Sequence, residues 1–174
     1  MLINFWASWC APCRSELRGF APDAGLIRAT RLDLVALSID GMGDDPSSTE
    51  ADGRKFMEQI EFPFRHGLAT AETLDKLEIL QRSLFDRHFP LALPLSILID
   101  RRGRVAVLYR GGLKSADLIR DLEVLGASRA DLRDLAVPFE GRWFSDPSQQ
   151  ASIVQYARWF EDRFPEEAIA LLRR

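Results

Sequence analysis

The chain has 174 residues, of which 47% are hydrophobic and 28% charged, a composition typical of a globular protein with one domain and a small appendage. The net charge of −3 and a pI near 5.5 argue against nucleic-acid binding, which usually shows a basic stripe. No segment approaches the roughly 20 consecutive apolar residues that a membrane-spanning helix needs. Nothing in the composition indicates an oligomeric state.

Strand-like residues follow Met1 at once, without a basic region or a cleavage site, so no signal peptide is recognised. We therefore expect the chain to be a fragment of a larger protein that begins inside a domain.

Residues 1–8 are mostly apolar and β-prone, which predicts a buried strand. The run from Cys10 to Arg18 predicts a helix, with Pro12 in the first turn where proline is tolerated. Pro22 and Gly25 are expected to break or kink that helix. Residues 32–40 are apolar on both faces, which predicts a central strand.

A capping-box signature at Ser47 and Glu50 predicts a second helix that runs to about Ile60. Residues 62–69 are expected to form a short extended segment. Residues 70–87 carry leucines at helical spacing, which predicts a third helix.

The runs 89–100 and 105–111 flank an Arg-Gly turn and predict a β-hairpin. A helix over 114–126 should end at Gly126. The composition then changes. Residues 137–148 predict a loop, and the remainder predicts a helix, a break at Pro165 and a second short helix. The element order predicts an α/β sandwich with a mixed sheet over 1–126, followed by a helical extension over 127–174.

The two cysteines, Cys10 and Cys13, are the only ones in the chain. They are too few for a disulfide-stapled scaffold or a four-cysteine zinc site. A site of two cysteines and two histidines would need His66 and His88, which lie 22 positions apart instead of about three to five. We therefore predict no metal site and no cofactor.

A cysteine at a helix start faces unpaired N–H groups and the positive end of the helix dipole, which lower the pKa of its thiol below about 8.5. Cys10 is therefore predicted as the nucleophile, and Cys13, one turn later, as the resolving thiol of a thiol–disulfide exchange. The alternative is two buried, inert thiols that happen to be close together.

Two segments, "INFWASWCAPCRSEL" and "LPLSILIDRRGRVAVLYRG", resemble the active-site segment and the cis-proline hairpin of TlpA/ResA-like redoxins, which are bacterial thioredoxin-fold proteins. The resemblance covers residues 1 to about 125. It implies a thioredoxin-like three-layer sandwich whose N-terminal hairpin is missing. It also implies that Pro94, after Leu93, is the cis proline beside the active site; Pro90 and Pro63 are alternatives.

The resemblance also implies roles for neighbouring residues. Trp9 shields the dithiol and offers a partner surface, or else it is a core or rim aromatic. Pro12, Leu93 and Pro94 are expected to contact substrate. Asn4 occupies the position of a buried, titrating Asp in classical thioredoxins, as is common in the TlpA-like group.

Three other polar side chains are not expected to belong to the site. Glu16 is expected to be a solvated helix residue, and His66 and His88 to be surface or loop histidines. Trp6 is expected in the core.

The function predicted is a protein disulfide oxidoreductase that uses the Cys10–Cys13 couple on protein thiols or disulfides, with a redox partner protein. Pro12 favours the reducing direction, and the resemblance favours an extracytoplasmic, periplasmic location. One alternative is a non-catalytic interaction module within a multidomain protein. The other is a peroxidase of the peroxiredoxin type, which normally carries Thr-x-x-Cys where this chain has Ala7-Ser8-Trp9-Cys10.

Overall fold

The computed structural model describes residues 1–42, 48–84, 91–125, 142–144 and 153–173. The chain divides into two compact units. The first comprises Met1–Thr70 and Ala92–Ser145, and the second comprises Ala71–Leu91 and Asp146–Arg174. Each unit is described by itself.

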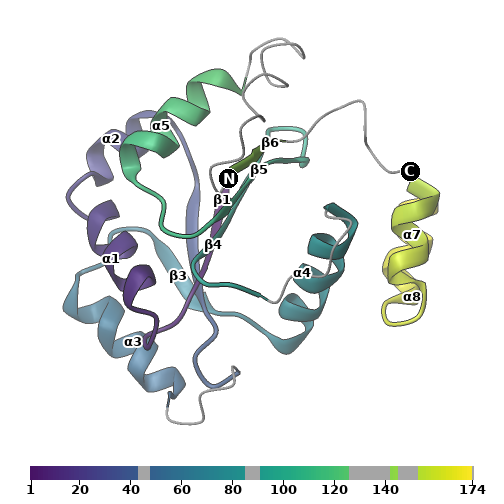
Figure 1. Cartoon of the computed structure of the whole chain (residues 1–174), viewed down its shortest axis with the longest axis horizontal. Helices are drawn as coiled ribbons and strands as arrows, with labels where there is room; N and C mark the ends of the chain where they lie inside the picture. Colours follow the sequence, from purple (N-terminus) through teal and green to yellow (C-terminus); the bar gives the residue numbers. More distant parts are fainter. Residues whose placement is uncertain (43–47, 85–90, 126–141, 145–152, 174) are drawn as a thin grey trace. The chain divides into compact units, whose positions relative to one another are not determined.

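The first unit is built on a six-stranded mixed sheet with the order β3-β2-β1-β4-β5-β6 (Figure 1). Strands β1, β2 and β3 are parallel to one another, whereas β4 pairs antiparallel with β1, β5 with β4 and β6 with β5. The bounds are β1 Leu2–Trp6, β2 Leu34–Ser38, β3 Arg65–Leu68, β4 Leu95–Ile99, β5 Val105–Arg110 and β6 Arg142–Phe144.

Four helices of this unit lie on one side of the sheet (Figure 1). They are α1 Ala11–Phe20, α2 Ala24–Ala29, α3 Glu50–Gln59 and α5 Ser115–Val124. Trp6 is 1% exposed and packs against Phe56 of α3, with ring centroids 5.4 Å apart, so its predicted place in the core is confirmed. Trp6, at the end of β1, thus helps to hold α3 against the sheet.

The predicted order of strands and helices is confirmed, including the interruption between α1 and α2 around Pro22. The predicted capping box was wrong, because α3 begins at Glu50 with Thr49 as its N-cap. The Asp52 carboxylate accepts hydrogen bonds from the Thr49 N–H at 2.8 Å and from the Thr49 hydroxyl at 2.7 Å. The same motif therefore occurs two residues later than its first sequence match.

Strand β6 was not predicted, since residues 137–148 were interpreted as a loop. It has only three residues and is defined by its pairing with β5, in which Val107 lies opposite Phe144. A strand of this length carries too little alternation to be recognised locally.

Several predictions lie outside the described residues. These are Ser47, Pro90, His88, the helix end at Gly126 and the rest of the loop over 137–148.

The second unit contains α4 Ala71–Leu84, α7 Ile153–Glu161 and α8 Pro165–Leu172. Ala157 of α7 and Ala168 of α8 are buried. Lys76 of α4 forms an ion pair with Glu167, and Arg163 pairs with Asp75 at 2.7 Å. Helix α4 therefore belongs with the C-terminal helices in this division. The domain boundary predicted at residue 126 falls outside the described residues and stays a prediction.

Among the helices of the described ranges, none combines the length and the apolar character that crossing a bilayer requires.

Candidate functional site

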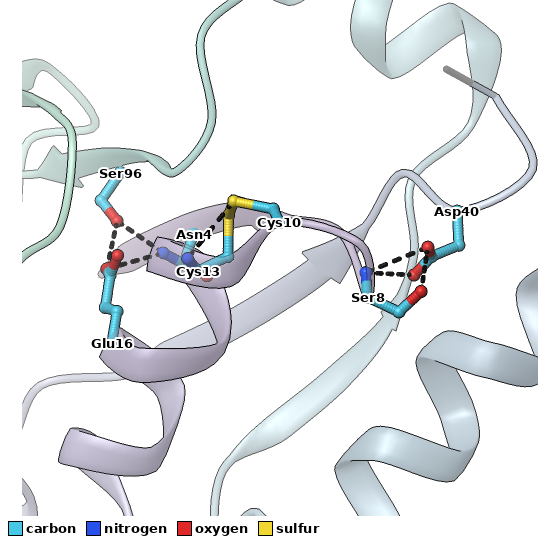
Figure 2. Close-up of a disulfide and its surroundings, with 7 residues drawn as sticks. All are labelled: Asn4, Ser8, Cys10, Cys13, Glu16, Asp40 and Ser96. Carbon is cyan, nitrogen blue, oxygen red and sulfur yellow. Dashed lines mark hydrogen bonds between the residues drawn. A yellow bond between two sulfur atoms is a disulfide. The ribbon is translucent and has the colours of Figure 1, made fainter. Parts of the chain in front are cut away.

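Cys10 and Cys13 form a disulfide at the start of α1 (Figure 2). Cys10 is 5% exposed, whereas Cys13 is completely buried. Of the two cysteines, only Cys10 therefore retains any solvent exposure. The two cysteines are brought together by one turn of helix, as the spacing predicted.

The disulfide lies where the chain passes from β1 into α1. Cys10 is the N-cap of α1, with extended backbone angles, and its sulfur accepts a hydrogen bond from the Cys13 N–H at 3.3 Å. Pro12 lies in the first turn, where a missing N–H removes no helix hydrogen bond. A thiolate formed at Cys10 is therefore stabilised by an N–H donor and by the helix dipole.

The loop that delivers Cys10 is anchored by Asp40, a fully buried carboxylate just after β2. Each Asp40 oxygen lies 3.0 Å from the Ser8 N, and one accepts the Ser8 hydroxyl at 2.7 Å (Figure 2). The Ser38 hydroxyl also donates to Asp40. These bonds join residue 8 to the end of the neighbouring strand, so Asp40 positions the segment that carries Trp9 and Cys10.

The sequence analysis did not identify Asp40. A signal was present, because Asp40 ends the strand predicted over 32–40, which is apolar on both faces. Asp40 therefore lies at the carboxyl end of that strand, the edge at which residues 7–10 leave the parallel strand β1.

A second buried polar cluster joins β1, α1 and β4. The Asn4 amide donates to Glu16 Oε1 at 2.9 Å and to the Ser96 hydroxyl at 2.8 Å (Figure 2). Ser96 in turn donates to Glu16 Oε1 at 3.4 Å. Glu16 Oε2 has no hydrogen-bond partner of normal geometry among the described residues.

Burial raises the pKa of Glu16 to about 8, against the lowering effect of the Leu113 backbone and of the Ser96 hydroxyl. The expectation that Glu16 is a solvated helix residue was therefore wrong, since the side chain is only 6% exposed. Cys13, Leu17 and Phe20 are the other buried residues of α1. Their spacing places Glu16 on the same buried face, one turn after Cys13, and that periodicity is the signal that could have found it.

The other predicted site residues lie as follows. Trp9 is 45% exposed, so the core alternative for this residue is wrong. The Leu93–Pro94 peptide bond is cis, as predicted. Leu95 pairs with Phe5, which places Pro94 at the edge of the sheet from which residues 7–10 leave β1. Leu93 is half-buried and Pro94 buried.

His66 is exposed on β3, with Nδ1 3.1 Å from the Phe64 carbonyl oxygen, in agreement with the expectation of a surface histidine. Within the described part of the chain, no three histidine, cysteine, aspartate or glutamate side chains are grouped as a metal ion would require.

Comparison with known proteins gives a family match over most of the first unit. The sequence model of the AhpC/TSA family matches residues 1–108. Thiol-disulfide oxidoreductase ResA of Geobacillus kaustophilus is 26% identical over 123 residues, which cover 71% of this chain and 61% of the relative. The ResA of Geobacillus thermodenitrificans is 24% identical over the same shares. The chain thus spans about three-fifths of the length of the curated relatives that it matches.

Solved structures share the fold. A thioredoxin family thiol:disulfide interchange protein of Chlorobium tepidum TLS superimposes with a TM-score of 0.55 at 22% identity, over 72% of this chain and 79% of that chain. StoA of Bacillus subtilis superimposes with a TM-score of 0.51 at 19% identity, over 69% and 79%. A candidate thiol:disulfide interchange protein DsbE of Chlorobium tepidum is 26% identical, with a TM-score of 0.52, over 72% and 79%. The predicted thioredoxin-like α/β fold is confirmed.

Proposed function

Because the chain belongs to the AhpC/TSA family and carries a dithiol couple at a helix start, we propose that it is a thiol–disulfide oxidoreductase that reduces protein disulfides. The observation that carries the proposal is the Cys10–Cys13 disulfide itself, in which Cys10 is slightly exposed and Cys13 is completely buried. This asymmetry is what a nucleophile and a resolving thiol require. The resemblance to the ResA and DsbE proteins supports the same chemistry.

The reaction starts from the reduced protein. The Cys10 thiolate attacks one sulfur of a partner's disulfide, which forms a Cys10–partner bond and releases the partner's second sulfur as a thiolate that takes up a proton. The Cys13 thiolate then attacks Cys10. The Cys10–Cys13 bond forms, the partner's first sulfur leaves as a thiolate, and two electrons have passed to the partner.

We propose that the ionised form of Glu16, which becomes populated as the pH approaches its pKa of about 8, takes the proton from Cys13. Its carboxylate lies on the same buried face of α1, one turn away, and its pKa of about 8 is close to the value of about 8.5 of a free thiol. A raised carboxyl pKa brings Glu16 closer to the range of thiols, which lowers the energetic cost of proton transfer from a thiol. Asn4 and Ser96 orient the carboxylate, so Glu16 supplies the titrating group that Asn4 lacks.

Trp9, Pro12, Leu93 and Pro94 are proposed to contact the partner protein. Trp9 is exposed directly before Cys10, and Pro12 is exposed between the two cysteines. Pro94 precedes the first residue of β4 at the same sheet edge.

Trapping of the mixed disulfide tests the proposal. Cys13→Ser retains the first attack but loses the fast intramolecular release, so disulfide-containing partners such as insulin should accumulate as DTT-sensitive adducts on Cys10. Cys10→Ser is the matched control and should trap nothing, because Cys13 is buried. The proposal is contradicted if Cys13→Ser forms no adduct and the wild type fails to reduce insulin.

The direction of electron flow is tested by the reduction potential of the couple. A reductant should lie near the value of about −270 mV of thioredoxin, and an oxidant near about −120 mV. An extracytoplasmic location is part of the proposal, and fractionation of the full-length protein tests it.

The two alternatives predict other outcomes. An interaction module would neither reduce insulin nor exchange its disulfide with a dithiol reagent. A peroxidase would consume hydrogen peroxide at the expense of a thiol donor.

A further inference from the structure

A groove lies beside the dithiol in the first unit. It has a volume of about 330 Å³ and is lined by Trp9 from the active-site loop, Arg14 from α1, and Asp52, Lys55 and Phe56 from α3, among others. Trp9 directly precedes Cys10, so the lining of the groove includes the residue next to the reactive cysteine. A segment of a partner whose cysteine meets Cys10 therefore comes within reach of this groove.

The groove carries positive charge that the described residues do not pair. The Arg14 guanidinium lies 5.3 Å from the Phe56 ring centroid, and the guanidinium of Arg18, which neighbours the groove without lining it, lies 5.2 Å from the same centroid. Arg14 Nε is buried without a hydrogen-bond partner among the described residues. In that part of the chain, no ion pair is formed by Arg14, Arg18 or Lys55.

Among the described residues that line the groove, Asp52 is the one acidic side chain, and it is already engaged. Its carboxylate accepts two hydrogen bonds from Thr49 in the first turn of α3, where the helix dipole also favours a negative charge. The Thr49 contacts, and more weakly the charge of Lys55, lower the pKa of Asp52. The cations of the groove therefore retain capacity for an external carboxylate.

From these contacts we infer that the groove is the docking surface for an acidic segment that flanks the reactive cysteine of the partner protein. This inference rests on the proposed function and names its substrate class. A guanidinium can bind a carboxylate through two parallel hydrogen bonds, while the exposed face of Trp9 accepts the apolar part of the segment. An extended chain advances about 3.4 Å per residue, so the acidic residue is expected within about three positions of the partner's cysteine.

The test uses three disulfide-linked peptides that differ only in the residues beside the cysteine, which are Glu, Ser or Lys. The wild type should reduce the Glu peptide with the highest kcat/KM. Arg14→Gln and Lys55→Gln should each lower the ratio of kcat/KM between the Glu and Ser peptides about fivefold, the size expected for one partly exposed ion pair. Added salt should lower the same ratio in the wild type.

Arg102→Gln is the matched control, since it removes the same charge at the tip of the β4–β5 hairpin, at the other end of the sheet. It should leave the ratio unchanged. An equal effect of Arg102→Gln and Arg14→Gln, or no preference for the Glu peptide in the wild type, overturns the inference.

A binding measurement separates this inference from the proposed function. The same peptides with serine in place of cysteine cannot be reduced, and their affinity for the wild type is measured by fluorescence polarisation. Tighter binding of the Glu peptide that is lost in Arg14→Gln supports the groove even if no peptide is reduced. Equal binding of the Glu and Lys peptides overturns it even if all of them are reduced.

Discussion

At the scale of single residues, the dithiol site depends on the carboxyl group of Glu16, which is buried in the core. Glu16 is buried on α1, and Asn4 and Ser96 donate to one of its oxygens. An amide at position 4 can donate to this carboxyl at any pH, whereas a second carboxylate there would repel it. The pair of Asn4 and Glu16 thus keeps one titrating group beside Cys13.

The raised pKa of Glu16 has a consequence for stability. The folded protein holds a proton on this carboxyl up to about pH 8, whereas the unfolded chain loses it near the ordinary value of 4.5. Between these values the folded state binds more protons, so its stability falls as the pH rises and the loss is complete above pH 8. At about 1.4 kcal/mol per pKa unit, the full effect is on the order of a few kcal/mol.

Glu16→Gln should remove this dependence. The free energy of unfolding of the oxidised variant, measured in urea from pH 5 to 9, is expected to vary less with pH than that of the wild type. Glu58→Gln, which changes an exposed carboxylate of α3, should keep the wild-type slope. An unchanged slope in Glu16→Gln would show that the carboxyl titrates normally.

At the scale of elements, the active-site loop depends on how closely α3 approaches β2. The Asp40 carboxylate and the Ser38 hydroxyl lie against α3 at Gly53. A Cβ at Gly53 would lie 2.6 Å from Asp40 Oδ2 and 3.0 Å from the Ser38 oxygen. Only a glycine leaves room for the carboxylate that holds Ser8.

Gly53→Ala should therefore destabilise the protein by about 1–3 kcal/mol, because the methyl group displaces Asp40 from its donors. Gly19→Ala is the matched control on α1, where no atom lies within 4 Å of the added Cβ. It should stabilise by up to about 1 kcal/mol through helix propensity alone. Urea unfolding of both variants measures the difference, and equal effects would contradict the role of the close approach.

At the scale of the whole molecule, the residues of the dithiol site belong to the first unit, and α4, α7 and α8 form the second. Buried alanines at 157 and 168 allow α7 and α8 to pack closely. We therefore expect that substitutions in the second unit leave the chemistry of Cys10 unchanged.

Ala168→Asp tests this separation. A buried, unpaired carboxylate should disrupt the packing of α8 against α7. This disruption should appear as faster hydrogen exchange of the backbone amides over 153–172. Insulin reduction should stay within about twofold of the wild type. Ala168→Ser is the milder control for the position. A large loss of reduction in Ala168→Asp alone would show that the second unit supports the dithiol site.

The sequence by itself determined the features that depend on neighbouring residues. The apolar run before Cys10, the proline in the first turn and the three-residue spacing predicted a strand, a helix and a disulfide at their junction. The segment before β4 predicted the cis bond at Pro94 through its resemblance to a family motif. Such signals are local, because capping, helix periodicity and turn chemistry act over a few residues.

Tertiary structure alone decided which polar groups are buried and what they contact. The sequence around Glu16 is that of an ordinary helix. Its raised pKa follows from burial beside Asn4 of β1 and Ser96 of β4. Asp40 holds Ser8 across 32 positions of sequence, and β6 exists only as a partner of β5. Burial and long-range pairing depend on how the helices and strands pack together, and this packing cannot be predicted from local patterns in a single sequence.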